Sequence, residues 1–600
     1  MRTIWRSSIA ATGCVVLLAA AWPASAEDGP TLYKQLCASC HDAGLARAPT
    51  RDVLEAMTPE RVLTALENGA MLSMASGRTG VERRAIAEFV TGKTFAAPLS
   101  TTPSPQAMCR ATPGEFANPL AGPVWNGWGV NTQNTRYQDQ PMAGLTAADV
   151  PRLKLKWAFG FPGELSADGQ PSMAGGRVFV GTQSGGVYAL GAATGCVHWV
   201  FQADAAVRAA VTIARIDTPA GGRVAAFIGD RSAIIYAVDA STGSPTFHNG
   251  RLYIGVASGE ETAGAAADYQ CCTFRGSLVA LNAATGALVW KTFTIPDEPR
   301  PRLKNKAGTQ LWGPSGSPIW SSPAIDVQRN AVYATTGNNY TGPATSSSDA
   351  FVAFDLDSGR ILWSRQMTAA DDWNTSCRLP DQLNCTNRDA PDHDFASPPI
   401  LVALGNGRRA LVAGQKSGVV HALDPDREGR ILWQERVGKG GINGGVQWGM
   451  ASDGERVYAA SSDVVVTRTA TTRTLDPSAG GGLTALRVSD GSLVWHATPP
   501  ACAGRPTCSP AQSAALTAIP GVVFSGSVDG HLRAYSTSDG TVIWSFDTVR
   551  EYQTVNGIDA RGGALDGPGP VVVNGMVLVN SGYMRFGGAP GNVLLAFTAN

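Results

Sequence analysis

The stretch GGVYALGAATGCVHW, residues 185–199, sets the fold because five later stretches repeat its pattern. The pattern is a small residue or Gly, a short strand, a turn rich in Asp, Ser or Thr that contains Gly, and a second strand that ends in Trp. Repeats of this kind predict a β-propeller in which each copy forms one blade. The six copies end at Trp199, Trp290, Trp363, Trp433, Trp495 and Trp544.

Two incomplete copies raise the count to eight. SAIIYAVDASTG, residues 232–243, stops without its Trp, and NVLLAF, residues 592–597, lacks its Trp strand near the C-terminus. An isolated LKLKWAF segment, residues 153–159, opens the region and can supply that strand. We therefore predict an all-β eight-bladed propeller, closed by a strand from the opposite end so that no sheet edge stays exposed. A solenoid would need capping segments that the sequence lacks.

One copy is abnormal. After Gly243 the expected Trp strand and the start of the next blade are absent, and SPTFHNGRLYIG, residues 244–255, follows the turn directly. About one strand and one connection are missing, judged against the other copies. Either the blade is incomplete or the sequence carries a deletion.

The composition and the N-terminus indicate an exported globular protein. Lys+Arg and Asp+Glu are equal at 48 each, so net charge gives no attraction to nucleic acid or an anionic membrane surface. Arg2 and Arg6 precede a short apolar run, and Ala24-Ser25-Ala26 ends it, as in a secretory signal. We expect a signal peptide over 1–26, an all-α cytochrome c domain over 27–95, a proline-containing linker over 96–120 and the propeller over 121–600.

Cysteine usage agrees with export. Of 11 cysteines, Cys14 lies in the signal and two belong to the CASCH motif, which leaves eight. Proximity in the sequence suggests three pairs, and the two cysteines that remain, Cys109 and Cys196, would pair across a long loop. The expected disulfides are Cys271–Cys272, Cys377–Cys385, Cys502–Cys508 and Cys109–Cys196.

CASCH, residues 37–41, predicts covalently attached haem c. The Cys37 and Cys40 thiols add to the haem vinyl groups, and the adjacent His41 binds the iron. A zinc site or a simple disulfide is the alternative for this spacing. The sixth iron ligand should be a methionine, with Met71 as our choice and Met74 as the alternative.

Two further features suggest a cofactor site in the propeller. Most tryptophans of the repeat are expected to pack between blades. Trp320, in GSPIWSSPAID, lies outside the repeat frame and could form a stacking floor for a planar cofactor. A bond between the adjacent Cys271 and Cys272 closes a strained small ring, which suggests function, whereas two free or separately paired thiols are the alternative.

From Trp125 to the C-terminus, the chain resembles the eight-bladed quinoprotein alcohol dehydrogenases that bind pyrroloquinoline quinone. Within that family it is most similar to members that also carry haem c and act on polyvinyl alcohol. The segments that carry the resemblance are WNGWGVNTQNTRYQ, CCTFRG, AGQKSGVVHALDPD, GGVQWGMASDG and SAALTAIPGVVFSGSVDGHLRAY.

The resemblance implies a quinone held between a disulfide of neighbouring cysteines and a tryptophan, with a calcium ion that polarises its reactive carbonyl. Calcium is a hard cation that prefers oxygen ligands. The positions that match the family's quinone contacts are Cys271, Cys272, Arg275, Trp320, Lys416 and Trp448. Glu261 and Asn338 match its calcium ligands.

The family's general base also has a candidate. The family places an Asp two residues before a Trp, and DDWN offers Asp371 at that spacing, with Asp372 beside it. Asn374 stands where an Asp is common, and an insertion follows, so a surface loop of solvated acids is the alternative. Asp392 and Asp394 in PDHDF are the other candidates for the base.

The implied function is oxidation of the secondary alcohol groups of polyvinyl alcohol to ketones in the periplasm. In that mechanism Asp371 takes the alcohol proton while hydride passes to the quinone. Electrons then pass through haem c to a soluble cytochrome acceptor. The alternatives are a quinohaemoprotein that oxidises small alcohols and a non-catalytic propeller that binds other proteins.

Overall fold

The fold is described on a computed structural model. It covers 28–42, 48–68, 71–75, 78–95, 102–110, 116, 118–218, 221–242, 250–405, 407–468, 473–502, 504–505, 508–584 and 587–599. The expected signal peptide and the abnormal junction at 243–249 lie outside these residues.

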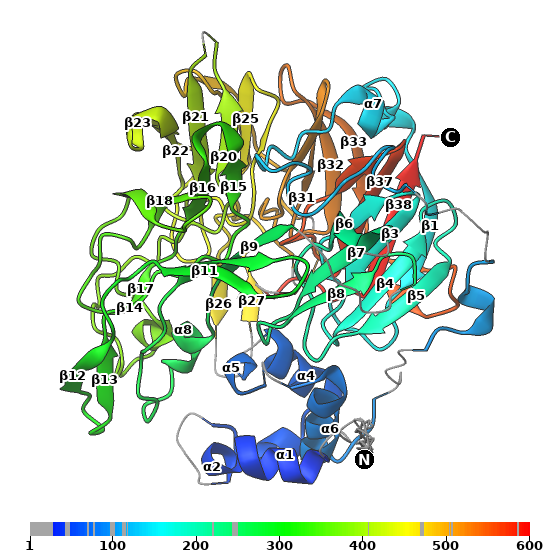
Figure 1. The fold of residues 1–600 in the computed structure, drawn as a ribbon. Helices are drawn as coiled ribbons and strands as arrows, with labels where there is room; N and C mark the ends of the chain where they lie inside the picture. Colours follow the sequence, from blue (N-terminus) through cyan, green and yellow to red (C-terminus); the bar gives the residue numbers. More distant parts are fainter. Residues whose placement is uncertain are drawn as a thin grey trace, which may run out of the picture.

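The N-terminal part is a small helical domain, as predicted (Figure 1). Thr79 and Glu82 form a capping box at the start of its last helix, and Gly92 ends that helix in the left-handed conformation. Buried Leu32, Leu63 and Ile86 belong to its core. The helices are α1 (Gly29–Leu36), α2 (Ala38–His41), α3 (Arg51–Glu55), α4 (Pro59–Asn68), α5 (Leu72–Ala75) and α6 (Gly80–Thr91).

The rest of the chain forms the predicted eight-bladed β-propeller, whose neighbouring strands within a blade are antiparallel. Blade one is β2–β5 (Ser172–Ala174, Arg177–Gly181, Gly186–Gly191, Val197–Gln202) and blade two is β6–β8 (Thr212–Thr218, Gly221–Gly229, Ile235–Asp239). Blade three is β9–β11 (Arg251–Val256, Ser277–Asn282, Leu288–Phe293) and blade four is β15, β16, β18 and β19 (Ala324–Asp326, Ala331–Thr335, Ala350–Asp355, Ile361–Gln366).

The other four blades follow the same plan. Blade five is β20–β23 (Ile400–Ala403, Arg409–Gly414, Val419–Asp424, Arg430–Arg436) and blade six is β24, β25, β28 and β29 (Ala451–Ser452, Arg456–Ala460, Leu483–Arg487, Leu493–Ala497). Blade seven is β30–β33 (Thr517–Ile519, Val522–Gly526, His531–Ser536, Val542–Asp547), and blade eight is β36–β38 with β1 (Val571–Val573, Met576–Ser581, Val593–Thr598, Lys154–Gly160).

Short elements decorate the ring. Two helices lie in its connections, and paired short strands extend them. The helices are α7 (Gln140–Ala143) and α8 (Glu260–Ala263); the strands are β12 (Arg300–Lys304), β13 (Gln310–Gly313), β14 (Ser315–Gly316), β17 (Asn339–Thr341), β26 (Val466–Arg468), β27 (Arg473–Leu475), β34 (Glu551–Tyr552) and β35 (Ala560–Arg561).

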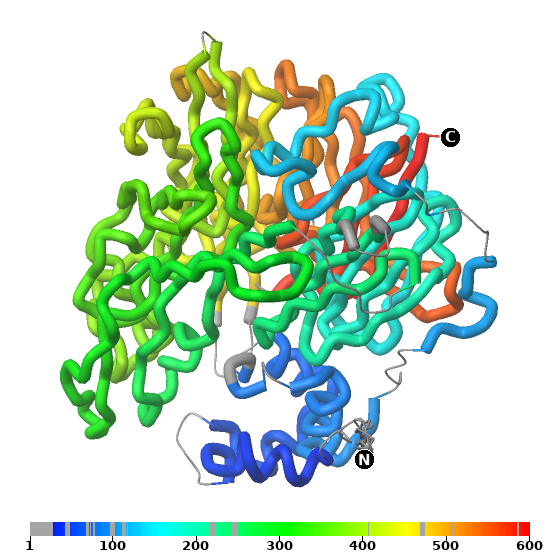
Figure 2. The backbone as a smooth tube through the Cα atoms, in the orientation of Figure 1, coloured from blue at the N-terminus to red at the C-terminus, as the bar shows by residue number. Residues whose placement is uncertain are grey.

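The ring closes as predicted. β1 pairs antiparallel with β38, from Lys154 opposite Thr598 to Gly160 opposite Val593. The C-terminal strands therefore lie beside the first strands of the propeller (Figure 2). The closing strand converts two edges, which could template aggregation, into an ordinary ladder.

The abnormal junction leaves two incomplete blades. Within the described residues, blade two has three strands and lacks the outer one, while blade three has three strands and lacks the innermost one. These are the strand and connection that the sequence pattern showed to be missing. The ring nevertheless keeps eight blades.

All four expected disulfides are formed, between Cys109 and Cys196, Cys271 and Cys272, Cys377 and Cys385, and Cys502 and Cys508. Cys37 and Cys40 remain free thiols, as haem attachment requires.

The helical domain packs against the propeller, below it in Figure 1. Arg83 donates to the carbonyl of Gln183 at 2.5 Å, and Arg84 donates to that of Gly163 at 2.9 Å. Gly80 lies so close to Ser184 that a Cβ atom there would come within 2.5 Å of the serine Cβ. In the part of the chain that the structure describes, no helix has the length and apolar character needed to cross a membrane.

Candidate active site

The disulfide between neighbouring cysteines sits in a loop that α8 holds in place. Cys271 and Cys272 are fully buried. The carboxylate of Glu260, at the start of α8, accepts hydrogen bonds from the backbone N–H groups of Thr273 at 2.9 Å and Phe274 at 2.7 Å. Glu260 is not among the predicted site residues, because nothing in a single sequence shows that its carboxylate folds back onto the CCTF loop.

Trp320, Trp448 and Lys416 come together, although they lie far apart in the sequence. The two indole rings meet edge to face, with centroids 5.9 Å apart, and the Lys416 ammonium lies 5.9 Å from the centroid of Trp320. The Trp448 Nε1–H donates to Asp566 at 2.8 Å, and the Arg208 guanidinium lies 5.0 Å from its ring centroid. The sequence predicts Trp320, Trp448 and Lys416 for this site. It does not predict Asp566 or Arg208.

Lys416 is buried between two carboxylates. Its Nζ lies 2.7 Å from Asp392 Oδ1 and 2.8 Å from Asp394 Oδ2. Burial disfavours the ammonium, but attraction to Asp392 and Asp394 outweighs that effect and raises the pKa of Lys416. The side chain is therefore a fixed positive charge at neutral pH, able to donate hydrogen bonds to a bound carbonyl or anion.

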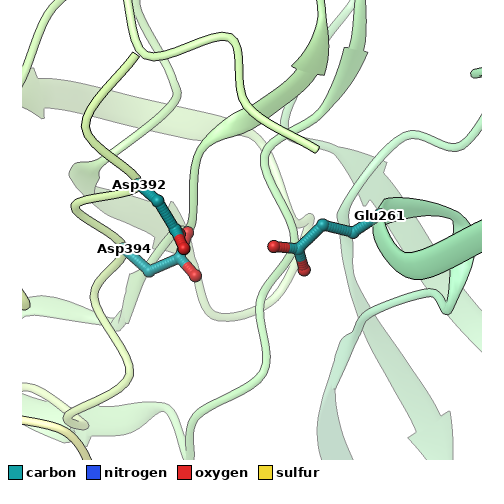
Figure 3. Close-up of side chains that lie close together, drawn as sticks. All are labelled: Glu261, Asp392 and Asp394. Carbon is teal, nitrogen blue, oxygen red and sulfur yellow. The ribbon is translucent and has the colours of Figure 1, made fainter. Parts of the chain in front are cut away.

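Three acids converge on one point in Figure 3. Glu261, from α8, faces Asp392 and Asp394 across the gap, and one oxygen from each of the three lies within 4.8 Å of the others. The two aspartates are buried and Glu261 is half-buried. The Lys416 ammonium offsets part of the repulsion between Asp392 and Asp394, and the carboxylates that face Glu261 are the ligands that calcium prefers.

Asn338 is joined to this cluster through its backbone. Its backbone N–H donates to Asp394 Oδ1 at 2.7 Å, which ties it to the acids. Its Nδ2 donates to the carbonyls of Asn339 and Trp373, both at 2.6 Å. Among the described residues nothing donates to the buried Oδ1 of Asn338. The three carboxylates and the unpaired buried amide oxygen of a residue whose backbone contacts Asp394 are oxygen ligands of the kind that calcium prefers, so the residues present suit calcium.

Asp371, the predicted base, is bound to the backbone of the segment that carries Asp392 and Asp394. It is fully buried, and its carboxylate accepts the backbone N–H of His393 at 2.7 Å and of Asp392 at 3.1 Å. Burial raises the pKa of Asp371 to about 6. Both oxygens thus hold the backbone that carries Asp392 and Asp394. Among the described residues nothing donates to the buried Oδ1 of Asp372, and burial raises its pKa as well.

Arg275 is turned toward the outer part of blade three. Its guanidinium donates to the carbonyl of Pro296 at 2.9 Å and lies 3.8 Å from the centroid of the Phe293 ring. It also lies 3.7 Å from the exposed Glu298 carboxylate. The structure therefore does not bring Arg275 to the group formed by Lys416 and the acids.

The CASCH segment is arranged to take a haem. The free Cys37 and Cys40 thiols flank the turn that leads to His41, in α2. Nδ1 of His41 lies 2.7 Å from the carbonyl oxygen of Pro49. A hydrogen bond there fixes the ring orientation and leaves Nε2 for the iron. The residues present fit haem c.

The two candidate methionines differ in environment. Met71 packs against the core of the helical domain, in the same cluster as Leu36 and Cys37, whereas Met74 has 45% of its side chain exposed. Met71 immediately precedes α5, and α5 contacts α8, the helix that carries Glu261. This contact brings the segment next to Met71 close to the acid cluster of the propeller.

An eight-bladed propeller with a buried disulfide of neighbouring cysteines, joined to a CxxCH helical domain, defines the class of quinohaemoprotein dehydrogenases. Family models agree with both parts. A repeat model described as outer membrane protein assembly factor BamB matches residues 142–372 and 416–586. A model described as cytochrome c oxidase, cbb3-type, subunit III matches residues 24–90.

Full-length relatives sharpen the assignment. The chain is 41% identical to a polyvinylalcohol dehydrogenase from Pseudomonas sp, over 98% of this chain and 97% of the relative. It is 37% identical to the enzyme of that name from Sphingopyxis sp. (strain 113P3), over 96% and 94%. The crystal structure of quinohemoprotein alcohol dehydrogenase from Comamonas testosteroni shares the fold, with a TM-score of 0.55, 19% identity and 82% and 83% coverage. The chain belongs to the polyvinyl alcohol dehydrogenase family, whose cofactors are pyrroloquinoline quinone and haem c.

Proposed function

We propose that the protein oxidises the secondary alcohol groups of polyvinyl alcohol to ketones in the periplasm. The substrate follows from the full-length relatives. The location follows from the signal-like segment 1–26. After it we place the cytochrome c domain over 27–95, the linker over 96–120 and the propeller over 121–600. The observation that carries the proposal is the buried group of Lys416, Asp392 and Asp394 facing Glu261.

Within this proposal the residues have separate roles. The Cys271–Cys272 disulfide, Trp320, Trp448 and Lys416 hold the quinone, which, when bound, accepts a hydride and later releases electrons one at a time. Glu261, Asn338 and Asp392 supply oxygen ligands for calcium. Arg275 has no role here, because its guanidinium is engaged by Pro296 and Phe293.

We place the general base at Asp394 and not at Asp371. Asp394 contacts both Lys416 and the backbone of Asn338, so it lies between the quinone-binding cation and a calcium ligand. A carboxylate there can take the hydroxyl proton of an alcohol bound between them. Both oxygens of each acid accept hydrogen bonds, but those of Asp371 go only to backbone N–H groups, of Asp392 and His393, whereas Asp394 contacts the Lys416 ammonium through its Oδ2. That contact with the proposed quinone-binding cation is the reason for the choice of Asp394.

The helical domain is where a haem would be held, with His41 and Met71 as the iron ligands. The α5–α8 contact would keep that haem close to the quinone site of the propeller. A bound haem would supply one-electron transfer to a soluble cytochrome or similar acceptor.

Dye-linked oxidation by the purified haem-loaded protein tests this function. Polyvinyl alcohol and a small secondary alcohol are compared, each with and without added pyrroloquinoline quinone and calcium. Oxidation of the polymer only when both are added, followed by haem reduction, supports the proposal. Oxidation of the small alcohol alone would make the protein a small-alcohol dehydrogenase, and absence of both oxidation and quinone binding would leave a binding propeller.

A further inference from the structure

The tryptophans of the outer strands fill equivalent sites between blades. In seven blades the Trp lies opposite an alanine of the neighbouring strand, as Trp199 lies opposite Ala189 and Trp290 opposite Ala280. The indole then reaches the turn of the next blade. The Trp290 Nε1–H, for example, donates to the carbonyl of Leu356, three residues before the turn glycine Gly359. The seven tryptophans are Trp157, Trp199, Trp290, Trp363, Trp433, Trp495 and Trp544.

These indoles press against the turn glycines. A Cβ atom at Gly429 would lie 2.6 Å from Trp363, and one at Gly540 would lie 2.6 Å from Trp495. Such distances are far below van der Waals contact. Each turn glycine is therefore matched to the indole that packs on it, as close packing between blades requires.

Between blades two and three the same site exists without a tryptophan. Ala237 in β8 stands where Ala189 stands in β4, because YAVDASTG repeats YALGAATG. The turn of blade three offers the carbonyl of Ala283 and the glycine Gly286 at the usual spacing. Among the residues that the structure describes, none has an atom within 4 Å of a Cβ placed at Gly286. The segment GSPTFHN, which follows β8, contains no tryptophan.

A cavity of about 250 Å³ marks the place. Most of the residues that line it are apolar, and Phe227, Ala237 and Ala283 among them are buried. The outer edge of β8 borders it, and no described strand pairs with that edge. The lining includes Phe227, Ile235, Ala237, Leu252, Leu281 and Gly286.

We propose that this site, defined by β8, Ala237 and Gly286 and called here the vacant wedge site, binds a tryptophan-bearing extended segment of a partner polypeptide. The segment pairs antiparallel with the free edge of β8, with its Trp opposite Ala237 and the indole over Gly286. Backbone pairing supplies affinity, and the indole site supplies selectivity, as in other cases of strand addition. The seven filled sites of the same ring define the geometry of the occupant.

A peptide copied from the chain's own outer strand provides the probe. We would measure fluorescence anisotropy of labelled ALVWKTF, the sequence of residues 287–293, with the full-length holoprotein. Saturable binding is expected, and it should weaken roughly tenfold or more when the peptide carries Trp290→Ala, because an indole contributes most of such an anchor. Gly286→Asn in the protein should weaken binding to a similar degree, since the new side chain occupies the site.

A matched variant checks that the site is open. Gly286 and Gly429 have nearly equal φ angles of 68° and 67°, which asparagine tolerates. Gly286→Asn should leave the melting temperature and the dye-linked activity unchanged, whereas Gly429→Asn should lower the melting temperature because it meets Trp363. An equal fall in melting temperature for Gly286→Asn and Gly429→Asn would overturn the proposal.

Two other results would also overturn it. One concerns the peptide: either it does not bind up to its solubility limit, or its affinity is unchanged both by Trp290→Ala in the peptide and by Gly286→Asn in the protein. The other is concentration-dependent self-association that Gly286→Asn abolishes, which would assign the site to a second copy of the chain.

Discussion

At the scale of single residues, the site is built on a carboxylate pair that shares one ammonium. Lys416 contacts Asp392 and Asp394 at 2.7 and 2.8 Å, so either acid can change while the other still compensates the buried charge. Asp371 stands apart, because its partners are backbone N–H groups. The two kinds of acid should therefore respond differently to the same substitution.

Asp394→Asn and Asp371→Asn test this difference. Asp394→Asn removes the proposed base, so kcat should fall by about a hundredfold or more, and the melting temperature should fall as well because an amide then faces the Lys416 ammonium. Asp371→Asn turns an amide toward a backbone donor and should cost about 1–3 kcal/mol of stability, with a smaller loss of kcat. Steady-state kinetics and thermal unfolding give both values. The reverse ranking in kcat would return the role of base to Asp371.

Some residues of the site could be predicted from the sequence, and others could not. Trp320 stood outside the repeat frame, and the adjacent Cys271 and Cys272 implied strain, so local sequence was enough. Glu260 and Asp566 act through contacts with distant residues, which one sequence does not reveal. The DDWN spacing singled out Asp371, but only the fold shows that its oxygens face the backbone.

At the scale of elements, α6 positions the haem domain on the propeller. Its first residue, Gly80, touches Ser184, and a larger side chain would separate the two parts. Gly80→Val should slow reduction of the haem by substrate several-fold, because electron transfer weakens steeply with distance. Oxidation coupled to a dye that takes electrons from the quinone itself should be unaffected.

Single-turnover haem reduction followed by absorbance gives the first rate, and steady-state dye reduction gives the second. Gly122→Val is the control, since a Cβ atom at Gly122 meets no atom within 4 Å. Equal haem reduction in both variants would show that the Gly80–Ser184 contact does not set the distance.

The same contact surface should make stability depend on pH. Burial, against the attraction of Arg83 and with the repulsion of Glu164 and Asp168 of the propeller, raises the pKa of Glu67, in α4, to about 7. A carboxyl with a raised folded pKa binds its proton more tightly when folded, so stability falls as pH rises from about 4.5 to 7. The loss is at most about 1.4 kcal/mol per pH unit.

Burial likewise raises the pKa of Asp168 to about 6, so it contributes in the same direction. Glu67→Gln should flatten the decline of melting temperature over this range, and Asp168→Asn should flatten its lower part. Thermal unfolding at several pH values measures both. If the melting temperature of Glu67→Gln declines with pH as steeply as that of the unchanged protein, Glu67 is excluded as the cause.

At the scale of the whole molecule, one disulfide fastens the segment after the helical domain to the ring. Cys109 and Cys196 are separated by 87 residues, and the Cys109 N–H also donates to Val197 at 2.9 Å. Loop closure over this length contributes about 4–5 kcal/mol, against about 2–3 for Cys377–Cys385, whose separation is 8. The double Cys→Ser variant at 109 and 196 should therefore lower the melting temperature more than that at 377 and 385.

The eight-bladed ring and its closure could be predicted because each blade repeats one local pattern, and a repeat carries its own geometry. The positions of the blades around the axis, and the placement of the helical domain on one face, depend on contacts such as Arg83 with Gln183. No local pattern records contacts of that kind.

The pairing of β1 with β38 has a consequence for biosynthesis. The ribosome makes β1 early and β38 last. The edge of β1 therefore stays unpaired while almost the whole propeller is translated. A chain that stops a few residues short of Val593 would carry every catalytic side chain and still leave the ring open. The ring can therefore close only after the final strand has been translated, because only then are the edge strands of the last blade paired.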